Sequence, residues 1–469
     1  MQAQKLLTCL FTVLMCAFAT GNASAQYSYY IDGAIIAGND SIGGPPSTQE
    51  LGRSGPSDTA FDGPTGICAD GSGNIYVADF YNNRVQRWHV GDKFGTTVVG
   101  TTSATGGSSN ALLNGPTGVA LDSHGNLFVS DRNNNRVMEY SSASISAIPD
   151  NGQITSTVSG TIFCGGFAYG SGKQDVNAPT GIFITLPDDS LYVAEGNDDT
   201  AGVYRVLRFP PGSSSGTLGT VVAGGAHSSG LSATPTNLDH PIGIYVNATT
   251  RDVYIADYGY HRVQEWSEPY TTGATVAGST IQAGANDSLL QQPCGVWLDA
   301  HGNLLVTDYQ NSRLMEYLQG DTFGIVVVGV PNAAGFTPDS LGSPYGICMD
   351  ASGHLFLTDD NYQIAKEYTY SATGVKAIKN LIIGVELYPN PSMGSFSLRS
   401  TVDPSLNGKD AYIMVMDING KVVFSEKVTV QNGSVNQQLQ MGDKVPDGVY
   451  QLELVSGNNK ANSKFEIIR

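Results

Sequence analysis

The sequence is poor in basic residues and lacks the short motifs that mark common metal centres. It has 24 Lys and Arg against 42 Asp and Glu, a formal net charge of −18 at pH 7. Nucleic acids and anionic membrane surfaces are bound by basic patches, so this balance argues against both as partners. The chain has no HExxH or EF-hand sequence. We therefore expect no metal and no other cofactor.

Cysteine is also scarce. Two of the six cysteines lie in the apolar N-terminal segment, which leaves Cys68, Cys164, Cys294 and Cys348. Cys68 and Cys348 hold equivalent places in two copies of a repeat described below, at a position expected to face the core. Buried free thiols are the simplest interpretation, and a disulfide stays open because exported proteins can form them.

Long apolar runs are missing after the N-terminus. Residues 1–25 have a basic start at Lys5, an apolar core over 6–19 and the small-residue sequence Ala23-Ser24-Ala25. This is the pattern of a secretory signal peptide. Its apolar run is too short for a transmembrane anchor, and no other run could span a membrane. We expect export without membrane insertion.

A repeated segment organises the next 340 or so residues. GPTGICADGSGNIYVADFYNNRVQRW begins at Gly63, and GPTGVALDSHGNLFVSDRNNNRVMEY begins at Gly115. Diverged copies begin at Ala178, His240, Gln292 and Ser343. The glycine of Pro-x-Gly marks the period: Gly295 and Gly346 are 51 residues apart, whereas Gly118 and Gly181 are 63 apart.

Each copy predicts a small antiparallel sheet. Short β-branched and aromatic runs alternate with Gly, Asn, Asp and Ser turns, which is the pattern of strands joined by hairpins. A fourth run follows each of the first five copies, at 96–100, 157–160, 220–224, 275–278 and 325–329. Four strands at a period of about 40–50 residues indicate a β-propeller. The sixth copy lacks a fourth run, and we expect residues 31–38 to supply it and close the ring.

These copies resemble NHL repeats, in which Pro-x-Gly-Ile is followed by Gly-Asn-Leu-Tyr-Val-Ala-Asp and then Asn-x-Arg. The resemblance implies an all-β fold, a six-bladed NHL propeller over residues 26–370. The third copy departs most, with Glu195 in place of the Asp and an insertion before Arg205. The sixth copy has Ile364 where the Arg is expected.

The last part of the chain is a different unit. After a linker at 371–384, residues 385–469 alternate short strands with Asn-Gly and Asp-Gly turns, which predicts a small Ig-like β-sandwich. Tyr388-Pro389-Asn390-Pro391, Gly448-Val449-Tyr450 and the terminal Lys-Phe-x-Ile-Ile-Arg resemble the type A C-terminal sorting domain of the type IX secretion system. That resemblance implies the type IX machinery as a partner, with the protein outside the cell or attached to its surface.

Two sets of residues are candidates for specific roles. An acid ends the second strand of a copy and an Arg begins the third, so a hairpin would pair them as structural fasteners. The pairs are Asp79 with Arg84, Asp131 with Arg136, Asp257 with Arg262, and Asp308 with Arg313.

The hairpin tips between them share a face with the loops before Pro-x-Gly. Aromatic and polar side chains there suit ligand binding. The candidates are Phe80, Tyr81, Arg132, His240, Tyr258, Tyr260, His261, Tyr309 and Tyr345.

The leading expectation is a non-catalytic protein that binds a glycan, peptide or protein ligand through the hairpin-tip face. An enzyme acting in the central channel, such as a lyase, lactonase or hydrolase, is the first alternative, and no residue is nominated as catalytic. A structural or adhesive surface protein is the second. The sequence leaves open the ligand, the oligomeric state and whether the mature protein is anchored or released.

Overall fold

The computed structural model describes residues 30–38, 60–150, 158–370 and 382–468. Gaps within these ranges fall at 93, 167–169, 171, 197–202, 228–232, 280–281, 322, 331–333, 336–339, 389–391, 393, 403–407, 409, 417–421, 442–444 and 457–458. The chain forms two compact units, Met1–Ser371 and Ala372–Arg469. The predicted signal peptide and most of the predicted linker lie outside the described residues and stay predictions.

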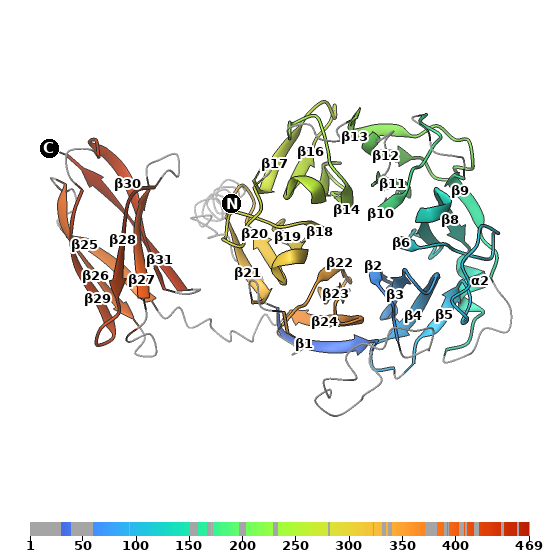
Figure 1. Ribbon diagram of the computed structural model, residues 1–469, viewed down its shortest axis with the longest axis horizontal. Helices are drawn as coiled ribbons and strands as arrows, with labels where there is room; N and C mark the ends of the chain where they lie inside the picture. Colours follow the sequence, from blue (N-terminus) through green and yellow to red (C-terminus); the bar gives the residue numbers. More distant parts are fainter. Residues whose placement is uncertain are drawn as a thin grey trace, which may run out of the picture. The chain divides into compact units, whose positions relative to one another are not determined.

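The first unit is a ring of four-stranded antiparallel sheets, which confirms the predicted all-β propeller (Figure 1). Six such sheets are found among the described residues, and we number these blades from the first repeat. Within each blade the strand that begins at Pro-x-Gly lies innermost (Figure 1).

The strands of the first three blades are β2 (Pro64–Ala69), β3 (Asn74–Asp79), β4 (Arg84–His89) and β5 (Thr96–Val99) in blade 1; β6 (Pro116–Leu121), β7 (Leu127–Asp131), β8 (Arg136–Tyr140) and β9 (Thr161–Gly165) in blade 2; and β10 (Pro179–Thr185), β11 (Ser190–Glu195), β12 (Val203–Phe209) and β13 (Thr220–His227) in blade 3.

The remaining blades are β14 (Pro241–Val246), β15 (Val253–Asp257), β16 (Arg262–Trp266) and β17 (Gly273–Gly278) in blade 4; β18 (Pro293–Leu298), β19 (Leu304–Asp308), β20 (Arg313–Tyr317) and β21 (Gly324–Gly329) in blade 5; and β22 (Pro344–Met349), β23 (Leu355–Asp359), β24 (Ile364–Tyr370) and β1 (Tyr30–Ala37) in blade 6.

Blade 6 takes its outer strand from the other end of the propeller sequence. Strand β1 pairs antiparallel with β24, with Gly33 opposite Tyr368 and Ala34 opposite Glu367. The prediction that residues 31–38 complete the last blade is therefore confirmed. The pairing also removes an unpaired edge from both ends of the repeat array.

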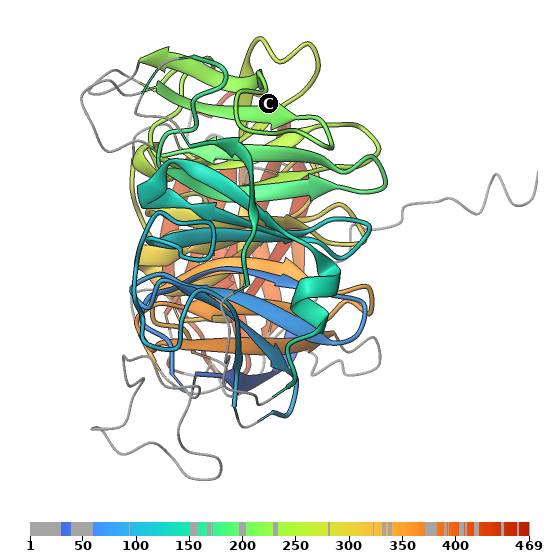
Figure 2. The same cartoon turned by 90° about the vertical axis from the view of Figure 1, so that its right-hand side faces the viewer.

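The predicted fourth strand of blade 2 is wrong by several residues. It was expected at 157–160, whereas β9 spans Thr161–Gly165. In the other repeats a glycine with positive φ lies within or directly after the fourth strand, and in blade 2 that residue is Gly165, with φ of 75°. A Cβ at Gly165 would lie 2.5 Å from the Asn135 carbonyl oxygen, so this place admits only glycine. The short helix α2 (Ser142–Ser146) occupies part of the longer connection, at the rim of the ring (Figures 1 and 2).

Apolar side chains from neighbouring blades pack together between the sheets. One cluster joins Tyr76 and Val85 of blade 1 to Val129 and Met138 of blade 2. Five further clusters follow around the ring, and the last joins blade 6 to blade 1. A single four-stranded sheet could not bury both of its faces, so the blades depend on one another for a core.

The glycine of Pro-x-Gly is explained by the approach of adjacent inner strands. A Cβ on Gly346 would lie 2.3 Å from the Thr65 carbonyl oxygen of blade 1, and one on Gly181 would lie 2.2 Å from the Ile242 carbonyl oxygen of blade 4. The other four repeat glycines face the backbone of the next blade in the same way. The strands can converge on the axis only where the side chain is absent.

The second unit is a β-sandwich. One sheet has the order β25 (Ile382–Tyr388), β26 (Ser395–Val402) and β29 (Ser434–Gln440), and the other has the order β28 (Val422–Thr429), β27 (Asp410–Met416), β30 (Gly448–Ser456) and β31 (Asn459–Ile467). Phe396 and Leu398 from the first sheet share one buried core with Ile413 and Leu452 from the second. No helix among the described residues is long and apolar enough to cross a membrane.

Candidate functional site

A cavity of about 260 Å³ lies on the hairpin-tip face of the propeller. It is lined by Gly63, Thr65, Phe80, Tyr81, Thr117, Arg132, Thr180, Gly196, His240, Ile242, Tyr258, Tyr345 and Asp360. Below it, a narrower space of about 60 Å³ runs between the inner strands and is lined by the repeat glycines and their neighbours. The larger cavity is therefore the mouth of the propeller channel, and we call it the mouth cavity.

Two positions of the repeat supply most of the lining. The inner ring is the middle residue of each Pro-x-Gly: Thr65, Thr117, Thr180, Ile242, Cys294 and Tyr345. The outer ring is the residue that follows the acid at the end of each second strand: Phe80, Arg132, Gly196, Tyr258, Tyr309 and Asp360. Ten of these twelve residues line the mouth cavity, all but Cys294 and Tyr309. The repeat thus places side chains from five of the six blades at one site.

In blades 1 to 3 the inner-ring threonines also join the blades. The hydroxyl of Thr117 donates to the Pro179 carbonyl at 2.8 Å, and that of Thr180 donates to the Pro241 carbonyl at 2.7 Å. Thr65 makes the equivalent bond to Pro116 at 3.4 Å. These bonds tie each inner strand to the next blade, so the three threonines are structural as well as cavity-lining.

In blades 5 and 6 the same hydroxyl comes from the second strand instead. Thr307 of β19 donates to the Tyr345 carbonyl at 2.8 Å, and Thr358 of β23 donates to the Thr65 carbonyl at 2.6 Å. The inner-ring residues of these blades, Cys294 and Tyr345, therefore need not supply a hydroxyl for the bond between blades. Blade 4 has Ile242 at its inner-ring position. The inner ring is therefore chemically varied in blades 4 to 6, whereas it consists of threonines in blades 1 to 3.

The predicted Asp–Arg pairs are all formed. In each, the Arg Nε donates to the acid Oδ2 at 2.7 Å, for Arg84 with Asp79, Arg136 with Asp131, Arg262 with Asp257, and Arg313 with Asp308. The side chains are almost fully buried. Arg313 also donates to the carbonyls of Ala285, Asn286 and Leu289, which anchors the loop that enters blade 5. This is the geometry of a structural fastener.

Blades 3 and 6 contain equivalents of these pairs. Glu195 and Arg205 were recognised in the sequence as departures of the third copy but were not predicted to pair, and the role of Lys366 was not predicted. In blade 3, Arg205 Nε donates to Glu195 Oε2 at 2.5 Å, across the insertion. In blade 6, the buried Lys366 takes the place of the missing Arg, two residues after Ile364: it donates to the Ser340 carbonyl and favours the ionised form of Asp359. Burial remains the larger influence and raises the pKa of Asp359.

The residue before each Arg makes a further contact with the next blade. Asn135 Oδ1 accepts from the Ala178 amide at 2.9 Å, and His261 Nδ1 accepts from the Gln292 amide at 3.2 Å. His261 is half-buried, and burial lowers its pKa. Tyr260 is buried, and its ring packs on Arg262 with 5.2 Å between the guanidinium carbon and the ring centroid. Neither His261 nor Tyr260 lines the mouth cavity, although both were expected on the binding face.

The other seven predicted binding residues gather at the mouth. Phe80, Tyr81, Arg132, His240, Tyr258 and Tyr345 line the cavity. Tyr309 does not line the cavity itself, but its hydroxyl donates to Oδ2 of the cavity residue Asp360 at 2.9 Å. Asp360 itself was missed, although its place directly after the conserved position of Asp359 in the repeat could have identified it. His240 is held by Asp239 through Nδ1 at 2.6 Å and by the Tyr204 hydroxyl through Nε2 at 3.1 Å.

The charged side chains at the mouth cavity influence the pKa of one phenol, that of Tyr345. Burial raises the pKa of Tyr345 well above its usual value. Arg132 and Asp360 influence the same group in opposite directions, since the guanidinium favours the phenolate and the carboxylate disfavours it. Burial also raises the pKa of Asp360, which Tyr309 opposes by hydrogen bonding and Asp359 and Asp62 reinforce by charge. The cavity therefore holds one cation and one carboxylate around a neutral Tyr345.

The four cysteines Cys68, Cys164, Cys294 and Cys348 are free thiols. Burial raises the pKa of each of them, so they are poor nucleophiles. Cys294 belongs to the inner ring and lines the narrow part of the channel.

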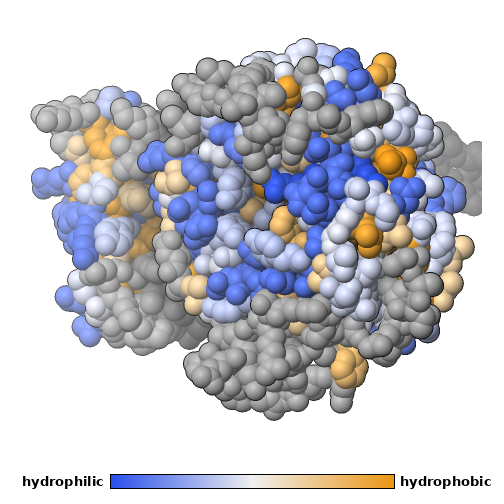
Figure 3. All heavy atoms as spheres, turned by 45° about the vertical axis from the view of Figure 1, so that its right-hand side comes forward, coloured by the Kyte–Doolittle hydropathy of each residue, from blue (hydrophilic) through white to orange (hydrophobic). Residues whose placement is uncertain are grey.

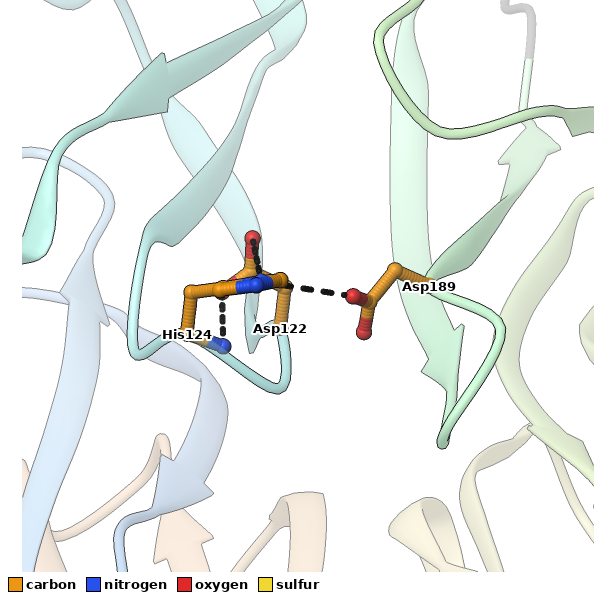
Figure 4. Close-up of side chains that lie close together, drawn as sticks. All are labelled: Asp122, His124 and Asp189. Carbon is orange, nitrogen blue, oxygen red and sulfur yellow. Dashed lines mark hydrogen bonds and ion pairs between the residues drawn. The ribbon is translucent and has the colours of Figure 1, made fainter.

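A second polar cluster lies on the opposite face, in turns between first and second strands (Figure 4). Asp122, His124 and Asp189 bring one potential ligand atom each within 4.8 Å of one another. Asp189 accepts from the amide and the hydroxyl of Ser123 at 2.9 and 2.6 Å, and Asp122 accepts from the His124 amide at 2.9 Å. Asp189 thus joins the turns of blades 2 and 3, whereas Asp122 stabilises its own turn.

Comparison with known families and structures agrees with this architecture. The NHL repeat model matches residues 61–88 and 113–140, and the model of the secretion system C-terminal sorting domain matches residues 386–468. The chain contains NHL repeats and a type IX C-terminal sorting domain. It is exported and reaches the cell surface through that domain, which is the part addressed to the type IX machinery.

Individual relatives are distant. The chain is 23% identical over 393 residues to the Arabidopsis thaliana chloroplastic protein SUPPRESSOR OF QUENCHING 1, a match that covers 77% of this chain and 33% of the relative. A Bacteroides thetaiotaomicron protein of unknown function has a similar structure, with a TM-score of 0.52, 19% identity and coverage of 72% of this chain and 76% of its own. PorZ of Porphyromonas gingivalis is also similar, with a TM-score of 0.41, 13% identity and coverage of 87% and 51%.

Proposed function

We propose that the propeller is a binding module that takes a glycan, peptide or protein ligand at the mouth cavity. The observation that carries this proposal is the division of labour within the repeat. The buried acid, its cationic partner and the repeat glycine hold the ring together. The inner-ring and outer-ring positions carry different residues, apart from three inner-ring threonines and two outer-ring tyrosines. Ten of these twelve residues converge on one concave site. Such a site, with a few polar groups among aromatic walls, is the usual form of a ligand pocket.

The aromatic lining supports recognition of an extended or ring-shaped ligand. Phe80 and Tyr81 meet edge to face with 4.9 Å between ring centroids, and Tyr345 meets Tyr309 in the same way at 6.0 Å. Tyr81 is 64% exposed at the rim. Aromatic rings offer a large contact area at a small cost in side-chain entropy, and a tyrosine adds a polar tip.

One face of the molecule can be compared with the mouth cavity. On the face drawn in Figure 3, hydrophobic side chains occur in small separate groups among hydrophilic ones. Scattered exposed apolar residues are normal for a soluble surface and mark no binding site. The mouth cavity is therefore the place where we look for the ligand.

The proposal is tested by screening the mature chain on glycan and peptide arrays and titrating the best binder. Tyr258→Ala and Phe80→Ala should each weaken binding at least tenfold, because truncating a buried aromatic contact costs about 2 kcal/mol or more at a binding hot spot. Phe323→Ala is the matched control, since Phe323 is exposed in a loop on the opposite face. Equal affinities for all four proteins would contradict the proposal.

One observation favours an enzyme as the second candidate. Asp360 lines a cavity, has a raised pKa and is hydrogen-bonded by Tyr309, which are the features of a general acid or base. Hydrolytic or ring-opening activity on lactone and ester substrates would support this function, provided that Asp360→Asn removes it and Asp188→Asn, on the opposite face, does not.

A further inference from the structure

The mouth cavity carries two opposite charges from blades that are not adjacent. Arg132 follows β7 in blade 2, and Asp360 follows β23 in blade 6. Blade 1 lies between them, and its outer-ring residue, Phe80, lines the cavity as well. Arg132 and Asp360 both line the mouth cavity, so their charges face the same space.

The carboxylate of Asp360 has no cationic partner among the described residues. The ion pairs found there do not include it, and its one hydrogen-bond donor is the neutral hydroxyl of Tyr309, at 2.9 Å. This differs from the neighbouring Asp359, which has Lys366. A half-buried carboxylate without a counter-ion is costly, and it becomes favourable when a ligand brings a positive charge.

The remaining lining suits an ammonium at the same place. Tyr345 and Tyr258 are half-buried phenols at the cavity, and Phe80 presents a third aromatic ring. An ammonium near aromatic faces gains cation–π attraction of about 0.5–2 kcal/mol. At the other side, the planar guanidinium of Arg132 offers the fork geometry that binds a carboxylate.

We propose that the mouth cavity recognises a ligand that carries both an ammonium and a carboxylate, with the chemistry of a short peptide or a free amino acid. The ammonium binds at Asp360 and the carboxylate at Arg132. This inference rests on the proposed binding function and names its ligand class. A neutral sugar would leave the Asp360 carboxylate without a counter-ion. The volume of about 260 Å³ agrees with a small ligand, because sites for drug-sized molecules occupy roughly 300–1,000 Å³.

The first experiment uses the mature chain and a panel of Xaa-Ala dipeptides, with binding measured by isothermal titration calorimetry. The best dipeptide is then compared with its N-acetyl form, its C-terminal amide and the form blocked at both ends. We expect each single block to weaken binding at least tenfold. Equal binding of the free and blocked forms would overturn the inference.

Substitutions then assign each charge to one end of the ligand. Asp360→Asn should abolish the preference for a free amino group and keep the preference for a free carboxylate, whereas Arg132→Gln should do the reverse. Arg251→Gln and Asp188→Asn are matched controls. These two residues form an ion pair at 3.0 Å on the opposite face, and the two substitutions remove the same charges there. If either mouth variant fails to fold, the four dipeptide forms on the unmodified chain decide the matter.

A neutral disaccharide, maltose, separates this inference from the function on which it rests. Binding of maltose that is lost in Tyr258→Ala, with no dipeptide bound, would refute the charged ligand and leave the binding module intact. If the array screen and both probes give no binding at the mouth, the inference and the proposed function fail together.

Discussion

Tyr309 of blade 5 donates a hydrogen bond across the blade boundary to Asp360 of blade 6, at 2.9 Å. The acceptor is a half-buried carboxylate whose pKa is raised mainly by burial. A carboxyl group with a raised folded-state pKa binds more protons in the folded protein than in the unfolded chain. Its contribution to stability is therefore greatest below the unfolded pKa and declines as pH rises through the folded pKa.

This sign predicts the behaviour of Asp360→Asn. The variant should gain stability relative to the unmodified protein as pH rises from about 3.8 toward neutrality, because the amide carries no charge to desolvate. Urea unfolding at a series of pH values, analysed as the difference between the two proteins, measures this term free of the other carboxylates. A difference that is constant with pH would contradict the raised pKa.

Removing one partner of a buried ion pair should strongly lower the free energy of unfolding. Arg313→Met leaves Asp308 buried without its cation, and we expect a loss of about 3–5 kcal/mol in the free energy of unfolding. Arg251→Met removes an arginine from a partly exposed pair with Asp188, and there the loss should be about 1 kcal/mol or less. Chemical denaturation of the two variants provides the comparison, and similar losses would show that Asp308 and Arg313 are not a fastener.

The close approach of the inner strands predicts a strong effect of one methyl group. Gly346→Ala would place a Cβ 2.3 Å from the Thr65 backbone oxygen, and the strands must separate to accept it. Overpacking of this kind costs about 1–3 kcal/mol. Gly71→Ala, where nothing lies within 4 Å, should change stability little. Melting temperatures of the two variants test this, and an unchanged Gly346→Ala protein would mean that the ring tolerates expansion.

The cysteines should be protected from thiol reagents in the native protein. Burial raises the pKa of Cys164, Cys294 and Cys348, which lowers the fraction of reactive thiolate and also blocks access. We expect slow alkylation by iodoacetamide in buffer and rapid modification of four thiols in guanidinium chloride, counted by intact mass. Fewer than four reactive thiols after denaturation would reveal a disulfide in the exported protein.

The architecture was predictable because its signal is repeated. A single Pro-x-Gly followed by an apolar run is ambiguous, but six copies in register specify strands, turns and ring. The closing role of residues 31–38 followed from the missing fourth strand of the last copy. Where the period was disturbed, prediction failed: the long connection in blade 2 hid β9, and Gly165 rather than Gly160 ends that strand.

The site was less predictable, since the sequence does not show how a hairpin tip turns. In blade 4 the 3-10 turn η2 (Tyr258–Tyr260) directs Tyr258 to the cavity and buries Tyr260 against Arg262. Two tyrosines two residues apart thus have different environments. Asp360 was overlooked because tips were judged by aromatic and amide content, whereas its repeat position places it in the same ring as Phe80 and Arg132.

The pairing of β1 with β24 has a consequence for the order of events in the life of the chain. The two strands that seal blade 6 are the first and last of the propeller, so the ring cannot be completed until the polypeptide has been made almost to the sorting domain. Contacts this distant in sequence form late and carry a large loop-closure cost. Until β1 pairs with β24, the outer edge of β24 has no partner strand. If the polypeptide were cleaved once between these two strands, their pairing would hold together two separate fragments of the propeller.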